Sequence, residues 1–412
     1  MSHILTSASV LTISVLLASG HSVIAQTRLD EARVQAILDR SIVIDLHSDT
    51  THLILNEGYD LAERHDYGQV DIPRMREGGM TAMFFATNPS SRRLTPLESI
   101  KRGLEEVAAI RREVARHPSQ LVLATTAEEI VAAKAENKMA ILMSIEGGHV
   151  IDSSLAVLRA FYDLGIRYMT LTHFTHTPWA DSSGEPPRSN GLTEEGKEIV
   201  REMNRLGMMV DVSHVSDETF YDVLETSAAP VIASHSSCRE FSSHPRNMSD
   251  DMLRALARNG GVVHINYANI YLDEEHRVAA NKFNTSDEWL DLRSQRQAIV
   301  ERYPDDPKRR GAARRKLNAE RLSRLGRVSL SRLLDHFEHA ARVAGVDHVG
   351  LGSDFDGVSD QLPEGMEDVS KTPNLVRGLL ERGFSEGDIE KILGQNTLRV
   401  MREVERVSRE NG

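Results

Sequence analysis

The chain has 412 residues, of which 40% are hydrophobic and 27% charged, so its composition is that of a folded globular protein and excludes disorder of the whole chain. Its 49 lysines and arginines against 61 aspartates and glutamates give a net charge of −12, which argues against nucleic acid or an anionic membrane as the main partner. The single cysteine, Cys238, excludes an intramolecular disulfide and is expected to be a small buried residue rather than a nucleophile.

The first 25 residues predict a cleavable export signal. Residues 4–18 are mostly apolar and small, a polar break follows, and small residues precede the expected cleavage site after Ala25. The apolar run lacks a preceding Lys or Arg, which is a departure from the usual signal, and it is too short for a comfortable membrane span. The charged C-terminus is not the hydrophobic tail of a glycolipid anchor. We therefore expect a protein without a membrane anchor that is exported to the periplasm or secreted.

The first predicted strand, residues 41–50 (SIVIDLHSDT), ends in the first pair of candidate metal ligands. A helical segment at residues 29–40 leads into it, and its aliphatic run stops at His47 and Asp49. Side chains two apart on a strand point the same way, so an imidazole and a carboxylate emerge together and could share one divalent metal. The alternative is a strand that ends in a polar turn, with His47 capping a local group.

Seven further apolar runs of strand length follow, at residues 81–87, 139–146, 168–173, 208–214, 230–235, 261–267 and 348–354. Between them lie amphipathic segments of helical period, for example residues 96–117, 154–164, 194–206, 217–225 and 250–259. Strands that are apolar on both faces and alternate with helices indicate a parallel sheet, and eight of them predict a (β/α)₈ TIM-type barrel. We expect residues 26–412 to form this barrel as a single domain.

Two segments depart from the repeat. Residues 273–325 are long, polar and rich in both signs of charge, which predicts a helical excursion after the seventh predicted strand with a turn near Tyr303. Its basic stretch, residues 308–316, is expected to be a solvated helix or an oligomer contact, because aromatic residues are not interleaved with it as in nucleic-acid sites. The second segment, residues 179–190, is rich in Gly, Pro and Ser and could act as a lid at the mouth of the barrel.

Several predicted strands end in a polar residue of catalytic type, namely His47, Asp49, Glu146, His173, His214, His235 and Asp354. Barrel enzymes build their sites at the carboxyl ends of the strands, so the fold would gather these residues into one cluster. In a barrel without such a site, Ser, Asn, Gly and Thr would be expected there instead.

This cluster predicts a binuclear metal site. His47, Asp49, His214, His235 and Glu146 exceed the three protein ligands of a usual catalytic zinc, but they suit two ions bridged by Glu146. His47 and Asp49 would hold one ion and His214 and His235 the other, with a shared water between them. Nitrogen and oxygen ligands favour zinc, with manganese or cobalt as alternatives.

Asp354 has the position for a general acid/base that moves a proton from the attacking water to the leaving nitrogen, and its alternatives are a sixth ligand or a turn residue. For Asp356 the structural role is the better interpretation. His173 could hold the developing oxyanion, with His176 as its rival.

The motifs IDLHSDT, SIEGGH, LTHFTHTPWADS, DVSHVS, ASHSS, RNMSDD, GLGSDFDGV and GQNTLRV occur in order between residues 42 and 402. Together they resemble the membrane (renal) dipeptidases, peptidase family M19. The resemblance implies an amidohydrolase-like barrel, two zinc ions per chain and hydrolysis of dipeptides, including some with a C-terminal D residue; some members also open β-lactams. It places the five zinc ligands on the residues named above, the substrate-oriented histidine on His173 and the acid/base on Asp354.

The resemblance also implies a role for Arg246, which would receive the free carboxylate of the substrate as a bidentate guanidinium. The glycolipid tail and cysteines of the animal enzymes are absent, so membrane anchoring and a disulfide-linked dimer do not transfer, and a homodimer is an expectation from the family alone. Residues 273–325 have no counterpart that we align, which leaves substrate preference open.

Our first hypothesis is a periplasmic dizinc dipeptidase. A second keeps the metal site but acts on another small amide, a β-lactam or a lactone, and a third is a binding protein on a barrel that has lost catalysis.

Overall fold

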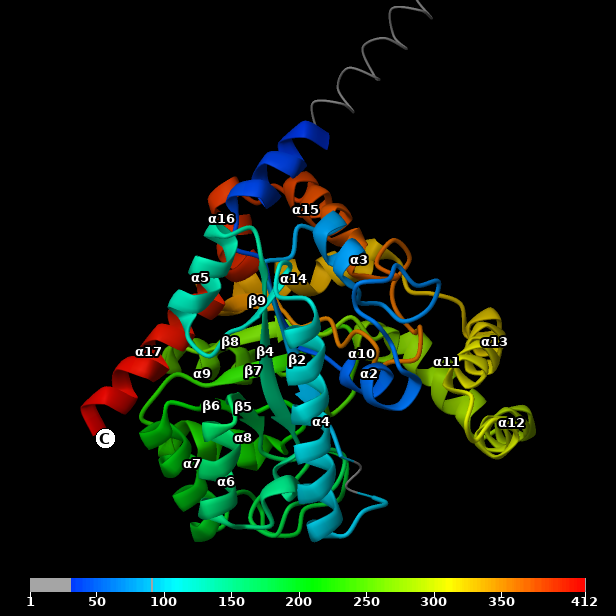
Figure 1. Cartoon of the computed structure of the whole chain (residues 1–412). Coiled ribbons are helices and arrows are strands. Elements are labelled where there is room, and N and C mark those ends of the chain that lie inside the picture. The colour runs from blue at the N-terminus through cyan, green and yellow to red at the C-terminus, as the bar shows by residue number, and fades with distance from the viewer. Residues whose placement is uncertain (1–30, 90–91, 412) are drawn as a thin grey trace, which may run out of the picture.

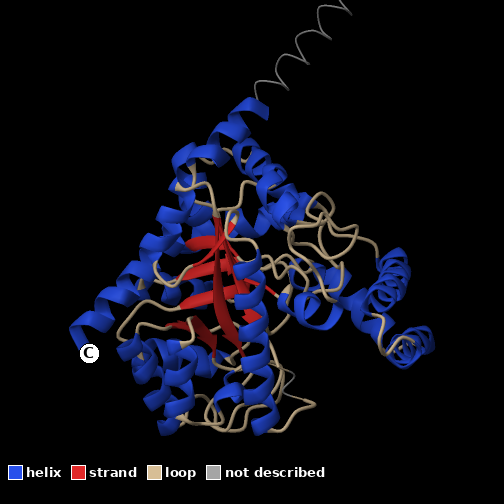
Figure 2. Cartoon of the chain, in the orientation of Figure 1, coloured by secondary structure: helices blue, strands red, loops and turns tan. Residues whose placement is uncertain are grey.

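The computed structural model describes residues 31–89 and 92–411, so the expected export signal at residues 1–25 lies outside the described residues. A parallel sheet forms the centre of the molecule and helices surround it (Figure 2). The strands are β1 (Ile44–Ser48), β2 (Ala82–Thr87), β3 (Leu121–Leu123), β4 (Met139–Glu146), β5 (Ile166–Thr170), β6 (Met209–Asp211), β7 (Ile232–Ser236), β8 (Val262–Ile265) and β9 (Val349–Leu351).

Eight of these strands close into the predicted barrel. Neighbouring strands pair in parallel in the order β2-β1-β9-β8-β7-β6-β5-β4, and β2 also pairs with β4 along its whole length, which closes the ring. The sequence pattern did not predict β3, which has only three residues between two helices. It pairs with the start of β4, Met139–Ile141, whereas β5 pairs with the end of β4. The (β/α)₈ architecture is confirmed, with β3 as an addition to it.

The helices around the barrel are α2 (Thr51–Glu57), α3 (Ile72–Glu77), α4 (Pro96–Arg116), α5 (Ala127–Ala135), α6 (Leu155–Asp163), α7 (Glu194–Leu206), α8 (Asp217–Thr226), α9 (Asp250–Asn259), α10 (Asn269–Leu272), α14 (Leu330–Ala344), α15 (Thr372–Glu381), α16 (Glu386–Glu390) and α17 (Asn396–Asn411). Residues 31–40 are helical as well. Local sequence explains several boundaries. Thr95 and Glu98 form a capping box that begins α4, and Gly207, in the left-handed region at φ 85°, ends α7. No helix in the described part of the chain has the length and apolarity needed to cross a membrane.

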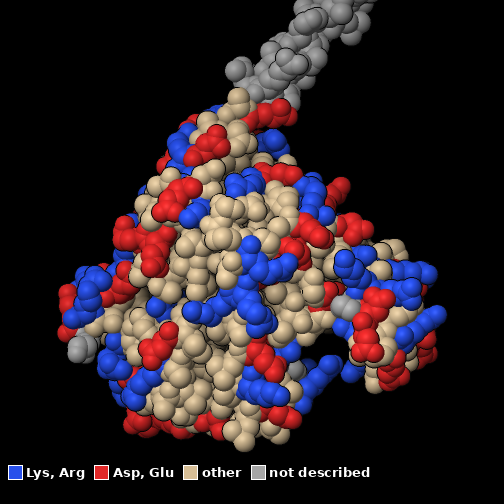
Figure 3. All heavy atoms as spheres, in the orientation of Figure 1, with Lys and Arg blue, Asp and Glu red and all other residues tan. Residues whose placement is uncertain are grey.

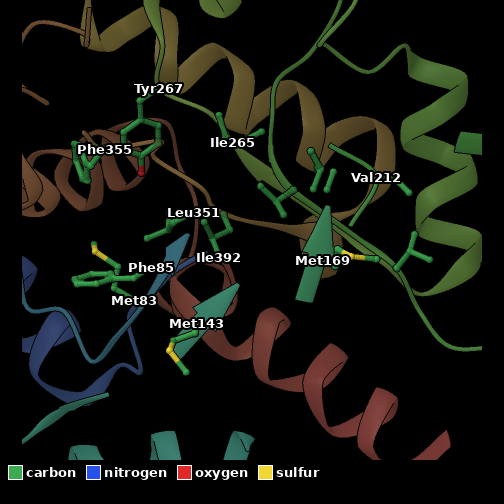
Figure 4. Close-up of a cluster of buried hydrophobic side chains, with 14 of the residues drawn as sticks. Met83, Phe85, Met143, Met169, Val212, Ile265, Tyr267, Leu351, Phe355 and Ile392 are labelled. Carbon is green, nitrogen blue, oxygen red and sulfur yellow. The ribbon is translucent and has the colours of Figure 1, made fainter. Parts of the chain in front are cut away.

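The alternation of side chains along the strands divides the core into two clusters. One face of the sheet contributes Ile44, Phe84, Leu142 and Tyr168, which pack with apolar residues of α5 and α17. The other face contributes to a larger cluster that includes the surrounding helices, part of which is shown in Figure 4. Glu146 has the same parity on β4 as Leu142, so the pattern that fills the first cluster also directs this carboxylate to the mouth of the barrel.

The helical excursion lies between β8 and α14 and forms a lobe of three helices, α11 (Glu274–Asn284), α12 (Asp287–Arg302) and α13 (Pro307–Leu325). In Figure 1 the lobe projects from the right side of the barrel. The chain leaves helix between α12 and α13 at residues 303–306, where Tyr303 was expected to mark a turn. The basic stretch of α13 is only partly solvated, because Arg314 pairs with the buried Glu57 of α2 at 2.6 Å. The lobe is therefore anchored to the rim of the barrel.

The single cysteine is enclosed by the protein. Cys238 is fully buried, and burial raises the pKa of its thiol. Its amide donates a hydrogen bond to Nδ1 of His336 in α14, at 3.0 Å. These contacts are those of the small buried residue that the sequence analysis expected.

Candidate active site

A cluster of imidazoles and carboxylates lies at the carboxyl ends of the strands. His47 lies in β1, Glu146 ends β4 and His235 lies in β7, whereas His214 and Asp354 each lie three residues beyond β6 and β9. All five side chains are buried. The parallel barrel thus brings together residues that are up to 307 positions apart in the chain.

The centre of this cluster is a single carboxylate oxygen. Glu146 Oε1 lies 2.9 Å from His214 Nε2 and 3.1 Å from His235 Nε2. It lies 3.7 Å from Nε2 of both His47 and His173. The Nε2 atoms of His214 and His235 are 3.0 Å apart. Four imidazoles therefore direct the same ring nitrogen at one oxygen, as they would around cations that the oxygen bridges.

Asp49 extends the cluster on the side of β1. Its Oδ2 lies 3.8 Å from His47 Nε2. The side-chain amide of Asn88 donates hydrogen bonds to Asp49 Oδ1, at 3.3 Å, and to Glu146 Oε2. The sequence analysis missed Asn88, although it directly follows β2. The same strand-end argument would have found it had amides been considered with histidines and carboxylates.

Hydrogen bonds behind the histidine rings fix which nitrogen faces the cluster. The Tyr168 hydroxyl donates to the Leu46 carbonyl at 3.0 Å, so it accepts from His47 Nδ1 at 2.7 Å. In the same way Ser234 Oγ donates to Asp211 at 2.6 Å and accepts from His235 Nδ1 at 2.7 Å. Nε2 of both rings therefore faces the cluster, where a neutral ring would offer its lone pair to a metal ion, the usual arrangement around metal-bound histidines.

The donor set fits divalent metal ions. His47 Nε2 is buried and has no hydrogen-bond partner in the described chain, a costly state that a cation would relieve. Within this cluster, three groups have ligand atoms close enough to hold an ion: His47, Glu146 and His235; Glu146, His173 and His214; and His47, Asp49 and Asp354. Glu146 and His47 each belong to two of these groups. The structure thus brings together all five predicted ligands and places His173 and Asp354 beside them.

Burial is the main cause of the pKa shifts in the cluster. Burial raises the pKa of Glu146 well above its usual value, and the Asp49 and Asp354 charges raise it further. Burial lowers the pKa values of His214 and His235 well below the usual value, so both rings are neutral and able to act as ligands. Although burial alone would raise the pKa of Asp49, its interactions with His47 lower it to about 2.

Asp354 faces the cluster from the loop after β9. Its backbone is left-handed (φ 62°), a conformation that Asp tolerates better than most residues, and Asn266 donates to its Oδ2 at 2.9 Å. Burial, assisted by the Asp49 charge, raises its pKa to about 6. Asp356 instead accepts hydrogen bonds from Thr50 and from the backbone of Gln69, so it ties the loop to its surroundings.

Arg246 lies beside the cluster, next to His235. Its guanidinium donates to the His235 carbonyl at 3.0 Å and to Ser236 Oγ at 3.3 Å, and it lies over the Tyr271 ring, 5.5 Å from the centroid. Its Nε is buried without a hydrogen-bond partner in the described chain. The side chain is therefore held in place while part of its donor capacity is unused.

The loop after β5 carries the two competing histidines. The sequence analysis placed His173 at the end of a strand, but β5 ends at Thr170, so His173 lies in the loop. It still reaches Glu146, and burial lowers its pKa to about 3. His176 does not reach the cluster: its Nδ1 accepts from the Ser182 amide and its Nε2 bonds to the Pro186 carbonyl.

The segment expected to act as a lid is pinned by internal contacts. The buried Asp181 carboxylate accepts from the backbone amides of Arg188, Ser189 and Asn190, and the Trp179 side chain is fully buried. These contacts give the segment a fixed shape. The segment lies beside His173 and helps to hold this residue in place.

Comparison with known proteins finds dipeptidases. The model of the membrane dipeptidase family (peptidase family M19) matches residues 31–412. An uncharacterized dipeptidase of Schizosaccharomyces pombe is 35% identical over 406 residues, which cover 93% of this chain and 85% of the relative.

Solved structures show the same fold. The probable dipeptidase PvdM from Pseudomonas aeruginosa is 24% identical with a TM-score of 0.74, covering 92% of this chain and 99% of its own. A metallo peptidase from Rhodobacter sphaeroides, liganded with a phosphinate mimic of the dipeptide L-Ala-D-Ala, is 24% identical with a TM-score of 0.71, covering 88% and 99%.

Proposed function

Because the chain belongs to the membrane dipeptidase family (peptidase family M19) and is a metallopeptidase of that dipeptidase type, we propose that it hydrolyses dipeptides to free amino acids with two zinc ions. The observation that carries the proposal is the convergence of four histidine Nε2 atoms on one oxygen of Glu146. The metal would be held by His47, Asp49, Glu146, His214 and His235. Nitrogen and oxygen donors of this kind favour zinc over harder cations.

When bound, the two ions would lower the pKa of a water and polarise the carbonyl of the scissile peptide bond. The remaining steps belong to side chains. Asp354, whose pKa is raised to about 6, takes a proton from the attacking water and delivers it to the leaving nitrogen. The neutral His173 ring donates a hydrogen bond to the oxyanion that develops on the carbonyl oxygen.

Arg246 gives the site its preference for dipeptides. A free carboxylate at the C-terminal end of the substrate would accept hydrogen bonds from the guanidinium, including its unused Nε. A longer peptide has an amide at that position and cannot make the same charged contact. We propose that both L,L and L,D dipeptides are substrates, a proposal supported by the L-Ala-D-Ala mimic bound to the Rhodobacter sphaeroides relative.

A metal analysis coupled to a panel of L,L-, L,D- and D,D-dipeptides tests this function. We expect about two zinc ions per chain, hydrolysis that a chelator abolishes, and little action on tripeptides. Full activity in metal-free protein would contradict the proposal. The Arg246→Ala variant should raise KM for dipeptides by roughly 10-fold to 100-fold, since hydrogen bonds to charged groups contribute about 1.5–3 kcal/mol. Unchanged turnover would favour a neutral amide or lactone as the substrate instead.

The expected export signal leads to a separate proposal, that the enzyme acts in the periplasm or outside the cell. Its support is the apolar segment that precedes Ala25. Cell fractionation and N-terminal sequencing of the mature protein test it. Recovery of the enzyme in the cytoplasm with residues 1–25 intact would contradict it.

A further inference from the structure

A cleft of about 580 Å³ separates the lobe from the mouth of the barrel. It begins at Asp49, one of the expected metal ligands, and its far wall is formed by α12 and α13. Figure 3 shows a hollow between the body of the molecule and the lobe, with both basic and acidic side chains along its edges. The cleft thus connects the candidate metal centre to the helical lobe, one of the two segments that depart from the barrel repeat.

Arginine is the most frequent residue in the walls of this cleft although the chain as a whole is acidic. Six of them line it: Arg93, Arg293, Arg296, Arg314, Arg315 and Arg321. The carboxylates that line it are Asp49, Glu57, Asp356 and Asp360. Asp49 belongs to the candidate metal centre, so its charge would be offset by bound cations, and the remaining charge of the cleft is positive.

Half of these arginines have their own partners. Arg314 pairs with Glu57 at 2.6 Å, and Arg315 lies over the Tyr67 ring, 4.3 Å from its centroid. Arg321 lies over the Trp289 ring at 4.7 Å. These contacts hold the lobe together and attach it to the barrel.

The other three arginines lack an anionic partner. Within residues 31–89 and 92–411, no carboxylate lies within 4.0 Å of the guanidinium of Arg93, Arg293 or Arg296. Surrounding protein lowers the pKa of Arg296, and repulsion from Arg314 and Arg93 lowers it further, while Glu57 acts in the opposite direction. All three side chains are exposed, and an anion bound beside Arg296 would relieve the repulsion that acts on it from Arg93 and Arg314.

The contacts of the metal centre indicate which end of a bound dipeptide would face the cleft. Arg246 contacts His235 and does not line the cleft, whereas Asp49 lies beside His47 and opens into the cleft. A dipeptide whose C-terminal carboxylate is held by Arg246 would place its first residue on the side of Asp49. A side chain on that first residue would then extend toward the lobe.

We propose that this cleft receives an acidic side chain, so that the enzyme prefers dipeptides with Asp or Glu as the first residue. The proposal rests on the proposed dipeptidase function and names a substrate class for it. Arg293 and Arg296, on successive turns of α12, are the specificity-determining residues, and Arg93 faces them from the barrel rim. Guanidinium groups suit this task because they bind carboxylates through two parallel hydrogen bonds.

Two dipeptides of nearly equal size test the proposal, L-Glu-L-Ala and L-Gln-L-Ala. With zinc-loaded enzyme at low ionic strength, we expect kcat/KM for Glu-Ala to exceed that for Gln-Ala by at least about tenfold. The ratio should fall as salt is added, because salt screens exposed charges. In the double variant Arg293→Gln/Arg296→Gln the ratio should approach one, and Arg293→Lys/Arg296→Lys, which keeps the charge, should restore part of it.

The matched control is Arg309→Gln, which removes the same charge from the lobe at a residue that pairs with Asp306 and does not line the cleft. It should keep the wild-type ratio. The zinc content of each variant reports whether the metal centre has folded.

Three outcomes would distinguish failure of this inference from failure of the proposed dipeptidase function. Equal rates for Glu-Ala and Gln-Ala, or a ratio that the double glutamine variant leaves unchanged, would overturn the inference while the dipeptidase function stands. A charge preference seen with Ala-Glu over Ala-Gln instead would overturn the placement of the first residue in the cleft. Absence of hydrolysis of any dipeptide by the zinc-loaded enzyme would refute the proposed function itself.

Discussion

The substitution Gly357→Ala separates the geometry of the active site from the stability of the fold. Gly357 lies in the loop after β9, and its backbone is outside the left-handed region, so alanine can adopt the same conformation. A Cβ at this position would meet Asp354 Oδ1 and Asp49 Oδ2 well inside van der Waals distance. Both atoms end flexible side chains, so the clash is relieved by moving the two carboxylates rather than the backbone.

The size of the effect follows from these contacts. Ordinary contacts of a Cβ lie at 3.4–4 Å, so each oxygen must retreat by about 1 Å, a displacement that typically lowers catalytic rates by about 10²-fold. Asp49 would also lose its position as a metal ligand. The stability of the metal-free protein should change little, because replacing glycine by alanine in a permitted conformation stabilises a protein by about 0.4–1 kcal/mol.

We would measure kcat/KM for a dipeptide, zinc content and urea unfolding for Gly357→Ala. The matched control is Gly387→Ala in α16, where an added Cβ meets only Ser385 Oγ at 3.9 Å. We expect a loss of about 10²-fold in kcat/KM for the first variant alone. If Gly357→Ala keeps wild-type kcat/KM and zinc content, the positions of Asp49 and Asp354 do not govern catalysis and the proposed mechanism is wrong.

Three further predictions concern the metal and the core. Tyr168→Phe removes the hydroxyl that orients His47 and should weaken zinc binding by about 10-fold to 100-fold in a competition titration with a chelator; unaltered affinity would show that the hydroxyl is dispensable. Free zinc at 1,000 times its Kd should raise the free energy of unfolding by about 4 kcal/mol over the metal-free protein, whereas no change in urea unfolding would argue against a metal bound to the folded state. His336 is buried, and burial lowers its pKa to about 4, so it is neutral in the folded state while its unfolded value is near 6.5. As pH falls below 6.5 the unfolded state takes up the proton first, so stability should fall by about 3 kcal/mol down to pH 4 in metal-free protein, and His336→Asn should lose this part of the pH dependence.

Much of the fold could be predicted because the sequence shows both the apolar runs of the strands and the helical period of the segments between them. The eight barrel strands were expected from apolar runs, and β4 has the predicted bounds. Strand ends were less accurate, since His173 and His214 lie beyond their strands in loops. The hydrogen bonds of the loops, such as those of Ser182 to the His173 and His214 carbonyls, place these residues, and apolar pattern does not encode them.

The site could be predicted only at positions where the residue type alone indicates its chemistry. Histidines and carboxylates at strand ends stood out, whereas Asn88, Tyr168 and Ser234 did not, because amides and hydroxyls are common in every strand and loop. Their roles depend on distances across the barrel. The arginines of the lobe were visible as charge, but their convergence on a cleft at Asp49 depends on how α12 and α13 pack.

The position of β9 has a consequence for the biogenesis of this enzyme. The last strand of the sequence inserts between β8 and β1, and the amide of Asp354, just beyond it, donates to the His47 carbonyl at 3.2 Å. Contacts between such distant segments form slowly, because a long loop must close before they are gained. A chain still emerging from the ribosome, with residues 349–351 not yet made, can neither seal the ring of strands nor juxtapose its acid/base with the histidines. Hydrolytic capacity should therefore arise only once synthesis is almost finished.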